Sequence, residues 1–296
     1  MKKSTVLALT LVVVGSMLLV TVASAQGGTV SRGGQLYDQW WKVVGADAPA
    51  DDHPLWATQS NNTRSGADTW RCKECHGWDY LGKDGAYGSG SHMTGFSGVY
   101  DAAQSKSADE LAAALKGATN PDHDFSSLLD DAAISDLATF MKEGLLDDRS
   151  YINYATKAPT SADTANGNQL FDAACAACHG ADGTTLNFGD EAEPEYVADV
   201  AGNPQEFLHK VRSGQPGTAM PSTIDLGWGV QDVLDVLAYA QTLPTGEEVT
   251  VAVLPETGGS RQPWPPQLLV MLLAGLLAVG AGMTVMTVEA LRRARL

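Results

Sequence analysis

The chain has 296 residues, of which 44% are hydrophobic and 18% are charged. This balance is typical of a folded protein and excludes a disordered chain. Its length has room for about two compact domains beyond any targeting segments. The formal net charge is −16, so the surface would repel the phosphates of a nucleic acid. We therefore expect no nucleic-acid partner, and the acidity serves either solubility or the docking of basic partners.

The first 25 residues have the pattern of a secretory signal peptide. Lys2 and Lys3 form a basic start, residues 6–22 are almost wholly apolar, and residues 23–25 are a small-residue cleavage site. We expect cleavage before Gln26. The protein is therefore predicted to be exported.

All four cysteines lie in two copies of the motif C-x-x-C-H, at residues 72–76 and 175–179. Two thiols at this spacing reach the two vinyl groups of one porphyrin, and the adjacent histidine ligates the iron. A redox dithiol, a local disulfide or a shared zinc site would also use paired cysteines. None of these alternatives explains why a histidine follows both pairs. We therefore predict two covalently bound haem c groups, with Cys72, Cys75, Cys175 and Cys178 as attachment sites and His76 and His179 as iron ligands.

Two further segments recur around these motifs. Gly33–Asp38 matches Gly167–Asp172, and each copy has an aromatic residue at its fifth position. Downstream, residues 134–140 and 233–239 are both typical of amphipathic helices that end in an aromatic residue. Within each copy we expect the two aromatic residues to pack together, which pairs Phe140 with Tyr37 and Tyr239 with Phe171.

The whole pattern resembles tandem class I cytochromes c, over nearly all of residues 31–243. The resemblance implies a mainly α fold in which the first and last helices of each domain cross, with the haem beneath them. We place the first domain at residues 31–148 and the second at 163–243, and a short linker rich in Ala, Thr and Ser joins them. Further helices are expected at residues 108–116 and 205–212.

An insert at residues 42–71 departs from the family's pattern. A segment of this length in a small domain either covers the cofactor or makes a functional surface, and the sequence does not favour one over the other. After the first haem motif, Trp78 and Tyr80 are expected to pack on the porphyrin.

The resemblance also implies a second axial ligand for each iron. In the second domain, residues 217–221 resemble the methionine loop of class I cytochromes c. Hydrophobic packing is the alternative role for a single methionine. The loop context favours Met220 as the distal ligand.

The repeat predicts the distal ligand of the first haem. Lys116-Gly117 aligns with Ser213-Gly214, and His123 and Met220 each stand six residues after the glycine. We therefore expect His123 as the ligand. The competing residues are His53, His92, Met93 and Met141, and His123 could instead be an exposed loop residue. His209 is expected at the surface or against a haem propionate.

The C-terminal part has the features of an anchor. Residues 268–288 are uninterrupted by charge and precede a basic tail, and at about 1.5 Å per residue they match the thickness of a bilayer. The basic tail predicts a cytoplasmic C-terminus. Within a linker at residues 244–266, Leu254-Pro255-Glu256-Thr257-Gly258 resembles a sortase sorting signal; a plain linker to a membrane helix is the alternative. Both alternatives predict an extracytoplasmic location, on the membrane or the cell wall.

Together these features predict a tethered dihaem cytochrome c that carries electrons between a redox-protein donor and acceptor. Methionine ligation raises the potential, so electrons are expected to pass from a His/His haem to a His/Met haem. Two six-coordinate irons indicate a carrier and not an enzyme, so we expect no catalytic residues. The alternatives are a dihaem oxidoreductase of the thiosulfate dehydrogenase or peroxidase type, and a cytochrome subunit of a respiratory complex.

Overall fold

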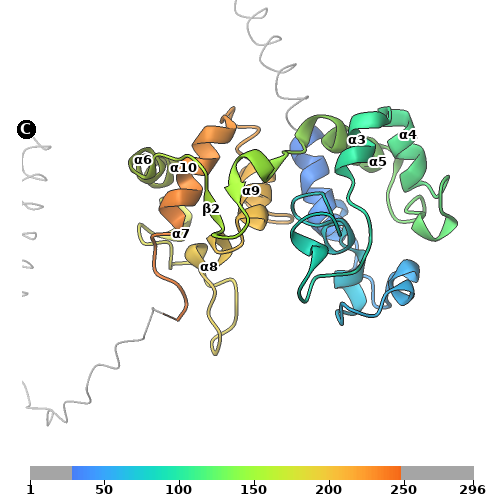
Figure 1. Ribbon diagram of the computed structural model, residues 1–296, viewed down its shortest axis with the longest axis horizontal. Helices are drawn as coiled ribbons and strands as arrows, with labels where there is room; N and C mark the ends of the chain where they lie inside the picture. Colours follow the sequence, from blue (N-terminus) through green and yellow to red (C-terminus); the bar gives the residue numbers. More distant parts are fainter. Residues whose placement is uncertain (1–28, 248–296) are drawn as a thin grey trace, which may run out of the picture. The chain divides into compact units, whose positions relative to one another are not determined.

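Helices account for most of the regular structure in the computed structural model, which describes residues 29–247 (Figure 1). The predicted mainly α class is confirmed for this part of the chain. Here the regular strands are one antiparallel pair, β1 (Ile152–Asn153) and β2 (Ala158–Pro159). None of the helices between residues 29 and 247 is both long and apolar enough to cross a bilayer. The predicted signal peptide, LPETG segment and anchor helix at residues 268–288 lie outside the described residues.

The first half of the described chain begins with a helix over residues 29–44. It ends with α5 (Asp131–Thr139), which continues as a π-helical turn, η5 (Phe140–Gly144). The elements between them are short: η1 (Pro54–Thr58), η2 (Gly66–Trp70), α2 (Cys72–His76), η3 (Ala86–Gly88), α3 (Tyr100–Ser105), α4 (Ala108–Leu115) and η4 (Pro121–His123). The helix predicted at residues 108–116 is confirmed as α4, and its first turn is fixed by a reciprocal capping box between Ser107 and Glu110.

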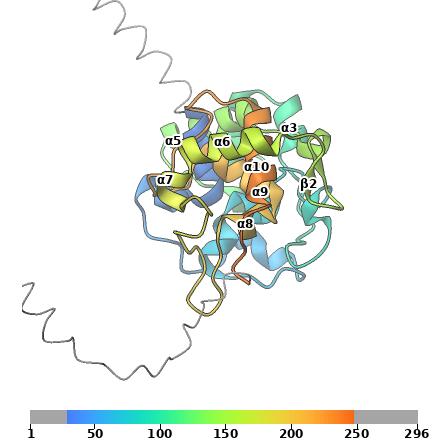
Figure 2. The same ribbon diagram turned by 90° about the vertical axis from the view of Figure 1, so that its left-hand side faces the viewer.

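The second half begins with η6 (Asp148–Ser150) and the β1–β2 pair. The remaining elements are α6 (Thr164–Ala174), α7 (Ala176–His179), α8 (Val197–Ala201), α9 (Pro204–Ser213) and α10 (Val230–Ala240). The helix predicted at residues 205–212 is confirmed as α9. In both ribbon views α6 and α10 lie side by side, so the ends of this half meet in space (Figures 1 and 2).

The first and last helices of each half cross at a glycine. A Cβ on Gly33 would overlap the carbonyl oxygen of Asp136, and a Cβ on Gly167 would overlap that of Asp235. Only glycine allows two backbones to approach so closely. Gly33 and Gly167 occupy the same place in the repeated segment, so the two crossings are equivalent.

The polar contacts at these crossings repeat as well. Arg32, which precedes Gly33, pairs with the carboxylate of Asp136. Asn166, which precedes Gly167, donates from Nδ2 to the carboxylate of Asp235 at 2.8 Å. The sequence repeat is therefore a structural repeat at the level of individual contacts.

Two hydrophobic cores lie in residues 29–247, one in each half. The predicted aromatic pairs are confirmed: the Tyr37 and Phe140 ring centroids are 5.8 Å apart, and those of Phe171 and Tyr239 are 5.4 Å apart. Ile152, from the predicted linker, is 2% exposed and belongs to the second core. We call residues 29–145 the first unit and residues 146–247 the second unit.

Candidate haem sites

The two C-x-x-C-H motifs have the same backbone conformation. α2 and α7 both end at a glycine with φ of 80°, Gly77 and Gly180. The N–H of each glycine donates to a carbonyl four residues earlier at 2.9 Å. The carbonyls of His76 and His179 accept N–H bonds from Gly82 at 2.8 Å and Thr185 at 2.9 Å, both six residues later. The second motif is therefore a structural copy of the first.

The cysteines do not form the alternative sites that paired cysteines can make. All four lie in the described range and are free of disulfides. Burial raises the pKa of Cys72 and Cys75 to about 12 and that of Cys175 to about 11. Such thiols stay protonated at neutral pH, unlike a reactive dithiol. Within residues 29–247, no cluster of three or more His, Cys, Asp or Glu is arranged to hold a metal ion.

A cavity lies beside the first motif. Apart from three histidines and the motif cysteines, its walls are mainly apolar or aromatic. Its lining residues are His53, Leu55, Thr69, Trp70, Arg71, Cys72, Cys75, His76, Phe96, His123 and Phe125. Two cysteines, a proximal histidine and an apolar wall are the groups that a covalently attached haem requires, so these residues fit it.

His76 and His123 lie in this cavity with their ring centroids 6.2 Å apart. If a haem were attached at the motif cysteines, His76 and His123 would both be available as ligands of its iron. Nδ1 of His76 lies 2.6 Å from the carbonyl oxygen of Ser97, and Nδ1 of His123 lies 3.4 Å from that of Ala114. A carbonyl only accepts, so each Nδ1 carries the proton and each Nε2 lone pair is free for a metal.

Burial also favours the neutral form of both rings. It lowers the pKa of His76 to about 4 and lowers the pKa of His123 below its ordinary value. A metal ligand must be the neutral imidazole. The structure thus brings together the two predicted ligands of the first haem in a form able to bind iron.

His53 is a third histidine in the same cavity, and it comes from the insert. Its ring lies 4.5 Å from that of Trp70 and 6.2 Å from that of His123, measured between centroids. Nδ1 of His53 accepts the backbone N–H of Leu55 at 3.2 Å, so the proton of the neutral ring is on Nε2. His53 therefore presents an N–H donor and not a lone pair. Its position depends on how the insert folds, which no sequence pattern revealed.

The insert covers the first cavity, which answers the question that the sequence left open. Five lining residues belong to it, and it is tied to α2 through Glu74, which is fully buried. Asn62 donates from Nδ2 to Glu74 at 2.9 Å, and Arg64 lies 3.3 Å from the same carboxylate. Burial tends to raise the pKa of Glu74, but His92, Lys73 and Asn62 outweigh it and hold the pKa well below its usual range.

Two of the competing candidates for the distal ligand, His92 and Met141, make contacts away from the first cavity. His92 stacks on Tyr87 at 4.6 Å and lies 3.3 Å from the Glu74 carboxylate. Met141 is 6% exposed within the first core. Neither residue lines the first cavity.

The second site has a different environment. His179 packs its ring against Phe188, with centroids 5.7 Å apart. Its Nδ1 is buried without a hydrogen-bond partner among the described residues. Cys175 and Met220 both pack against the second core, which places an attachment cysteine and the predicted distal ligand on the same core.

His123 and Met220 follow equivalent helix ends. α4 and α9 both run into a glycine in the left-handed region, Gly117 with φ of 77° and Gly214 with φ of 83°. Each glycine opens a loop that leads to the last helix of its half, α5 or α10. The alignment that predicted His123 from Met220 therefore corresponds to matching local structure.

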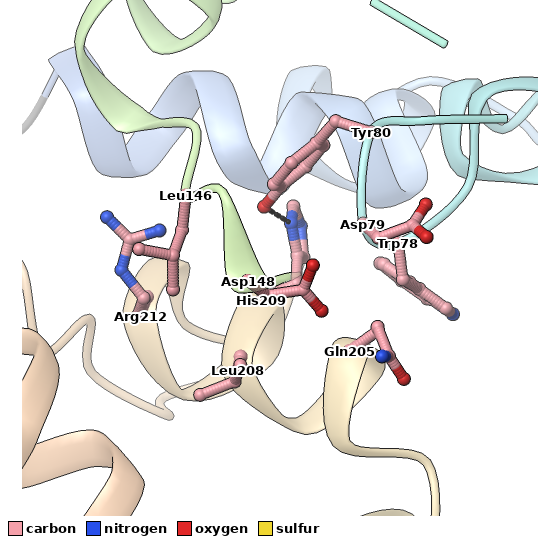
Figure 3. A pocket seen from close by; sticks show the side chains of 9 residues that line it. All are labelled: Trp78, Asp79, Tyr80, Leu146, Asp148, Gln205, Leu208, His209 and Arg212. Carbon is pink, nitrogen blue, oxygen red and sulfur yellow. Dashed lines mark hydrogen bonds between the residues drawn. The ribbon is translucent and has the colours of Figure 1, made fainter. Parts of the chain in front are cut away.

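The two units meet at α9, where three predictions from the sequence are wrong. His209 is 2% exposed, not at the surface. Its Nε2 donates to the carbonyl of Gly34 at 3.0 Å, and its Nδ1 accepts from the Tyr80 hydroxyl at 2.9 Å (Figure 3). Trp78 and Tyr80 do not line the first cavity but pack against His209, with ring centroids 4.9 Å and 6.0 Å away. Local sequence could not reveal this because the contact joins residues more than a hundred positions apart.

Charges reinforce this contact. Lys210 of α9 donates to the Asp38 carboxylate at 2.9 Å, and Arg71 pairs with the same group. Burial tends to raise the pKa of Asp38, but the two cations outweigh it and hold the pKa at about 2. Asp38 therefore stays charged, and Arg71, one of its two cationic partners, directly precedes the first C-x-x-C-H motif.

The second unit matches a cytochrome c family model. The model is that of the cytochrome C oxidase, cbb3-type, subunit III, and it covers residues 162–239. This match agrees with the duplicated motif geometry and supports a c-type cytochrome domain with haem c in the second unit. A haem domain of this kind serves electron transfer and implies redox-protein partners. Searches of curated proteins and of solved structures found no match to the chain.

Proposed function

We propose that the protein is an exported dihaem cytochrome c that carries electrons from a His/His haem in the first unit to a His/Met haem in the second. The observation that carries this proposal is the equivalence of the two halves, in which the helix crossings, motif turns and distal loops correspond. The family match covers one half. The structural equivalence of the two halves supports the same chemistry in the other half.

The chain's residues have distinct roles in this proposal. Cys72 and Cys75 hold the first haem, and His76 and His123 ligate it. Cys175 and Cys178 hold the second haem, and His179 and Met220 ligate it. Each haem, when bound, supplies a one-electron iron couple, and methionine gives the second the higher potential. His53, Trp70 and Phe125 shield the first site from water.

A spectroscopic measurement on the full-length protein tests the proposal. We expect paramagnetic resonance of the oxidised protein to show one low-spin His/His centre and one low-spin His/Met centre. Mass analysis should show two covalently bound haems. A large high-spin signal would remove the carrier model and favour the oxidoreductase alternative, since an enzyme needs an open iron position.

A second candidate, a cytochrome subunit of a respiratory complex, is favoured by the oxidase-subunit model that residues 162–239 match. Native electrophoresis of detergent-solubilised membranes distinguishes the two. A free carrier migrates alone, whereas a subunit comigrates with partner chains through its C-terminal segment.

We propose that this segment, residues 254–288, tethers the protein outside the cytoplasm. Mass analysis of the cell-associated protein would show an end at Thr257 after sortase cleavage, or an intact Leu296 for a membrane helix.

A further inference from the structure

An exposed apolar pair lies beside the second haem motif. Leu186 is 43% exposed and Phe188 is 45% exposed, and they are among the few large hydrophobic side chains so exposed in residues 29–247. Phe188 also contacts His179, the predicted iron ligand, with ring centroids 5.7 Å apart. Solvent-exposed aromatic surface in contact with a redox ligand is a place where a second protein could approach the haem.

The same loop carries a dense set of acids. Asp190, Glu191, Glu193 and Glu195 directly follow the apolar pair, and all four are exposed. Hydrogen bonds within the loop fix its shape, since Phe188 N–H donates to the carbonyl of Glu195 at 2.8 Å. Asn187 also accepts the N–H of Glu195 at 3.0 Å. We call residues 186–195 the acidic loop.

Residues 163–247 of the second unit offer little compensating positive charge on their free surface. Residues 163–247 contain 13 Asp and Glu but only two Lys and Arg, Lys210 and Arg212. Lys210 is bound to Asp38 of the first unit at 2.9 Å. Arg212 donates to the carbonyl of Gly144, also in the first unit, at 2.8 Å. Both cations of this segment are therefore turned toward the first unit, and the exposed cations of the second unit, Arg149 and Lys157, lie outside the segment that carries the acidic loop.

We propose that the acidic loop is the docking surface for a basic redox protein that exchanges electrons with the second haem. This inference rests on the proposed function, because it assumes that the second site holds a haem. Charge complementarity selects the partner: acids around an approach path attract a positive protein and raise its association rate. The apolar pair at the centre then excludes water from the contact nearest His179, as in protein interfaces with a polar rim.

Stopped-flow kinetics on the full-length holoprotein tests the proposal. The protein is reduced and mixed with an oxidised, basic, soluble cytochrome c as probe, and the second-order rate constant is measured against salt concentration. The loop variant E191Q/E193Q/E195Q removes three charges without changing side-chain size. We expect its rate constant to fall about tenfold at low ionic strength. The difference should vanish at about 0.5 M NaCl, where screening is strong.

The matched control is D47N/D84N/D101N, which removes three charges from exposed positions of the first unit. We expect this control to change the rate less than twofold, and we expect L186S to slow the reaction at every salt concentration. If the control slows the probe as much as the loop variant does, net charge alone is responsible and the docking surface is refuted. An unchanged rate in the loop variant refutes it as well.

Ferricyanide, a small anion, separates this proposal from the proposed function. If the reduced holoprotein gives electrons to neither oxidant, the carrier function fails and the docking surface fails with it. If it reduces ferricyanide normally while the loop variant and the unmodified protein reduce the basic probe equally, only the docking surface fails.

Discussion

The histidines of the two C-x-x-C-H motifs differ in the partner of Nδ1. His76 donates from Nδ1 to the carbonyl of Ser97 at 2.6 Å, whereas Nδ1 of His179 has no partner among the described residues. A hydrogen bond from Nδ1 makes an imidazole a more basic ligand and stabilises the oxidised metal. In the proposed assignment, the first site would be biased toward a lower potential by His76 as well as by His123. Both effects would favour the proposed electron flow from the first unit to the second.

The distal assignment predicts the effect of H123A. Among the described residues that line the cavity, His123 is the histidine besides His76 whose Nε2 lone pair is free. Its loss should therefore turn the first haem high-spin and leave the second haem low-spin. Low-temperature paramagnetic resonance measures both centres at once.

H53A is the matched control for H123A because it removes a histidine from the same cavity. His53 is held with its proton on Nε2, so the first haem should stay low-spin without it. An unchanged spectrum in H123A, or a high-spin first haem in H53A, would overturn the assignment of His123.

At the scale of elements, the helix crossings hold each unit together. The 29–44 helix crosses α5 at Gly33, and α6 crosses α10 at Gly167. Beside each crossing stands a pair of buried aromatic rings. The crossing positions the two outer helices, and the loop that leads into the last helix carries His123 or Met220. Changes at the glycine should therefore disturb both packing and ligand position.

The variant G167A tests this arrangement. Its methyl group would overlap the carbonyl of Asp235, so the helices must separate. We expect the free energy of unfolding to fall by about 1–3 kcal/mol, as for other overpacked cores. Urea unfolding followed by circular dichroism measures the change. N168A, one residue later on the exposed side of α6, should leave stability within about 0.5 kcal/mol. Equal effects of the two substitutions would show that the crossing does not need glycine.

Local patterns predicted these elements well, because motif spacing and helical periodicity record short-range structure. The C-x-x-C-H turns, the aromatic pairs and the helices that became α4 and α9 could all be predicted. His53 and His209 could not. His53 reaches the cavity through an insert without regular periodicity, and His209 is buried by residues of the other unit. Both positions depend on contacts with residues distant in the sequence. The local sequence around each histidine is charged or polar and gives no sign of these contacts.

At the scale of the whole described molecule, a buried acidic group lies where the units meet. Asp148 and Asp79 are 3% and 2% exposed and line the same cavity as His209 (Figure 3). The hydroxyl of Tyr154 lies 2.6 Å from Asp148 Oδ1 and 3.2 Å from Asp79 Oδ2. One hydroxyl proton cannot serve two carboxylates. Asp148 Oδ2 has no partner among the described residues, so its charge is poorly compensated.

This arrangement predicts a pH-dependent stability. Burial raises the pKa of Asp148 from 3.8 to about 6. A raised pKa in the folded state means that the free energy of unfolding falls as pH rises from about 4 to about 6. D148N should remove this loss and stabilise the protein at pH 7 by up to about 3 kcal/mol, with little effect near pH 3.5. Urea unfolding of both proteins across this range measures the difference. The exposed Asp84→Asn change is the control, and parallel curves for D148N and the unmodified protein would contradict the prediction.

The contact of α9 with the first unit also constrains how the two halves can evolve. Two structurally equivalent halves are interchangeable in principle, and either could be shuffled into another gene. Here Lys210, Arg212 and His209 all satisfy groups of the first unit, at Asp38, Gly144 and Gly34. Transplanting one half would leave Asp38 buried with part of its compensation missing, which is costly. The halves are therefore expected to be inherited together, with correlated substitutions across α9.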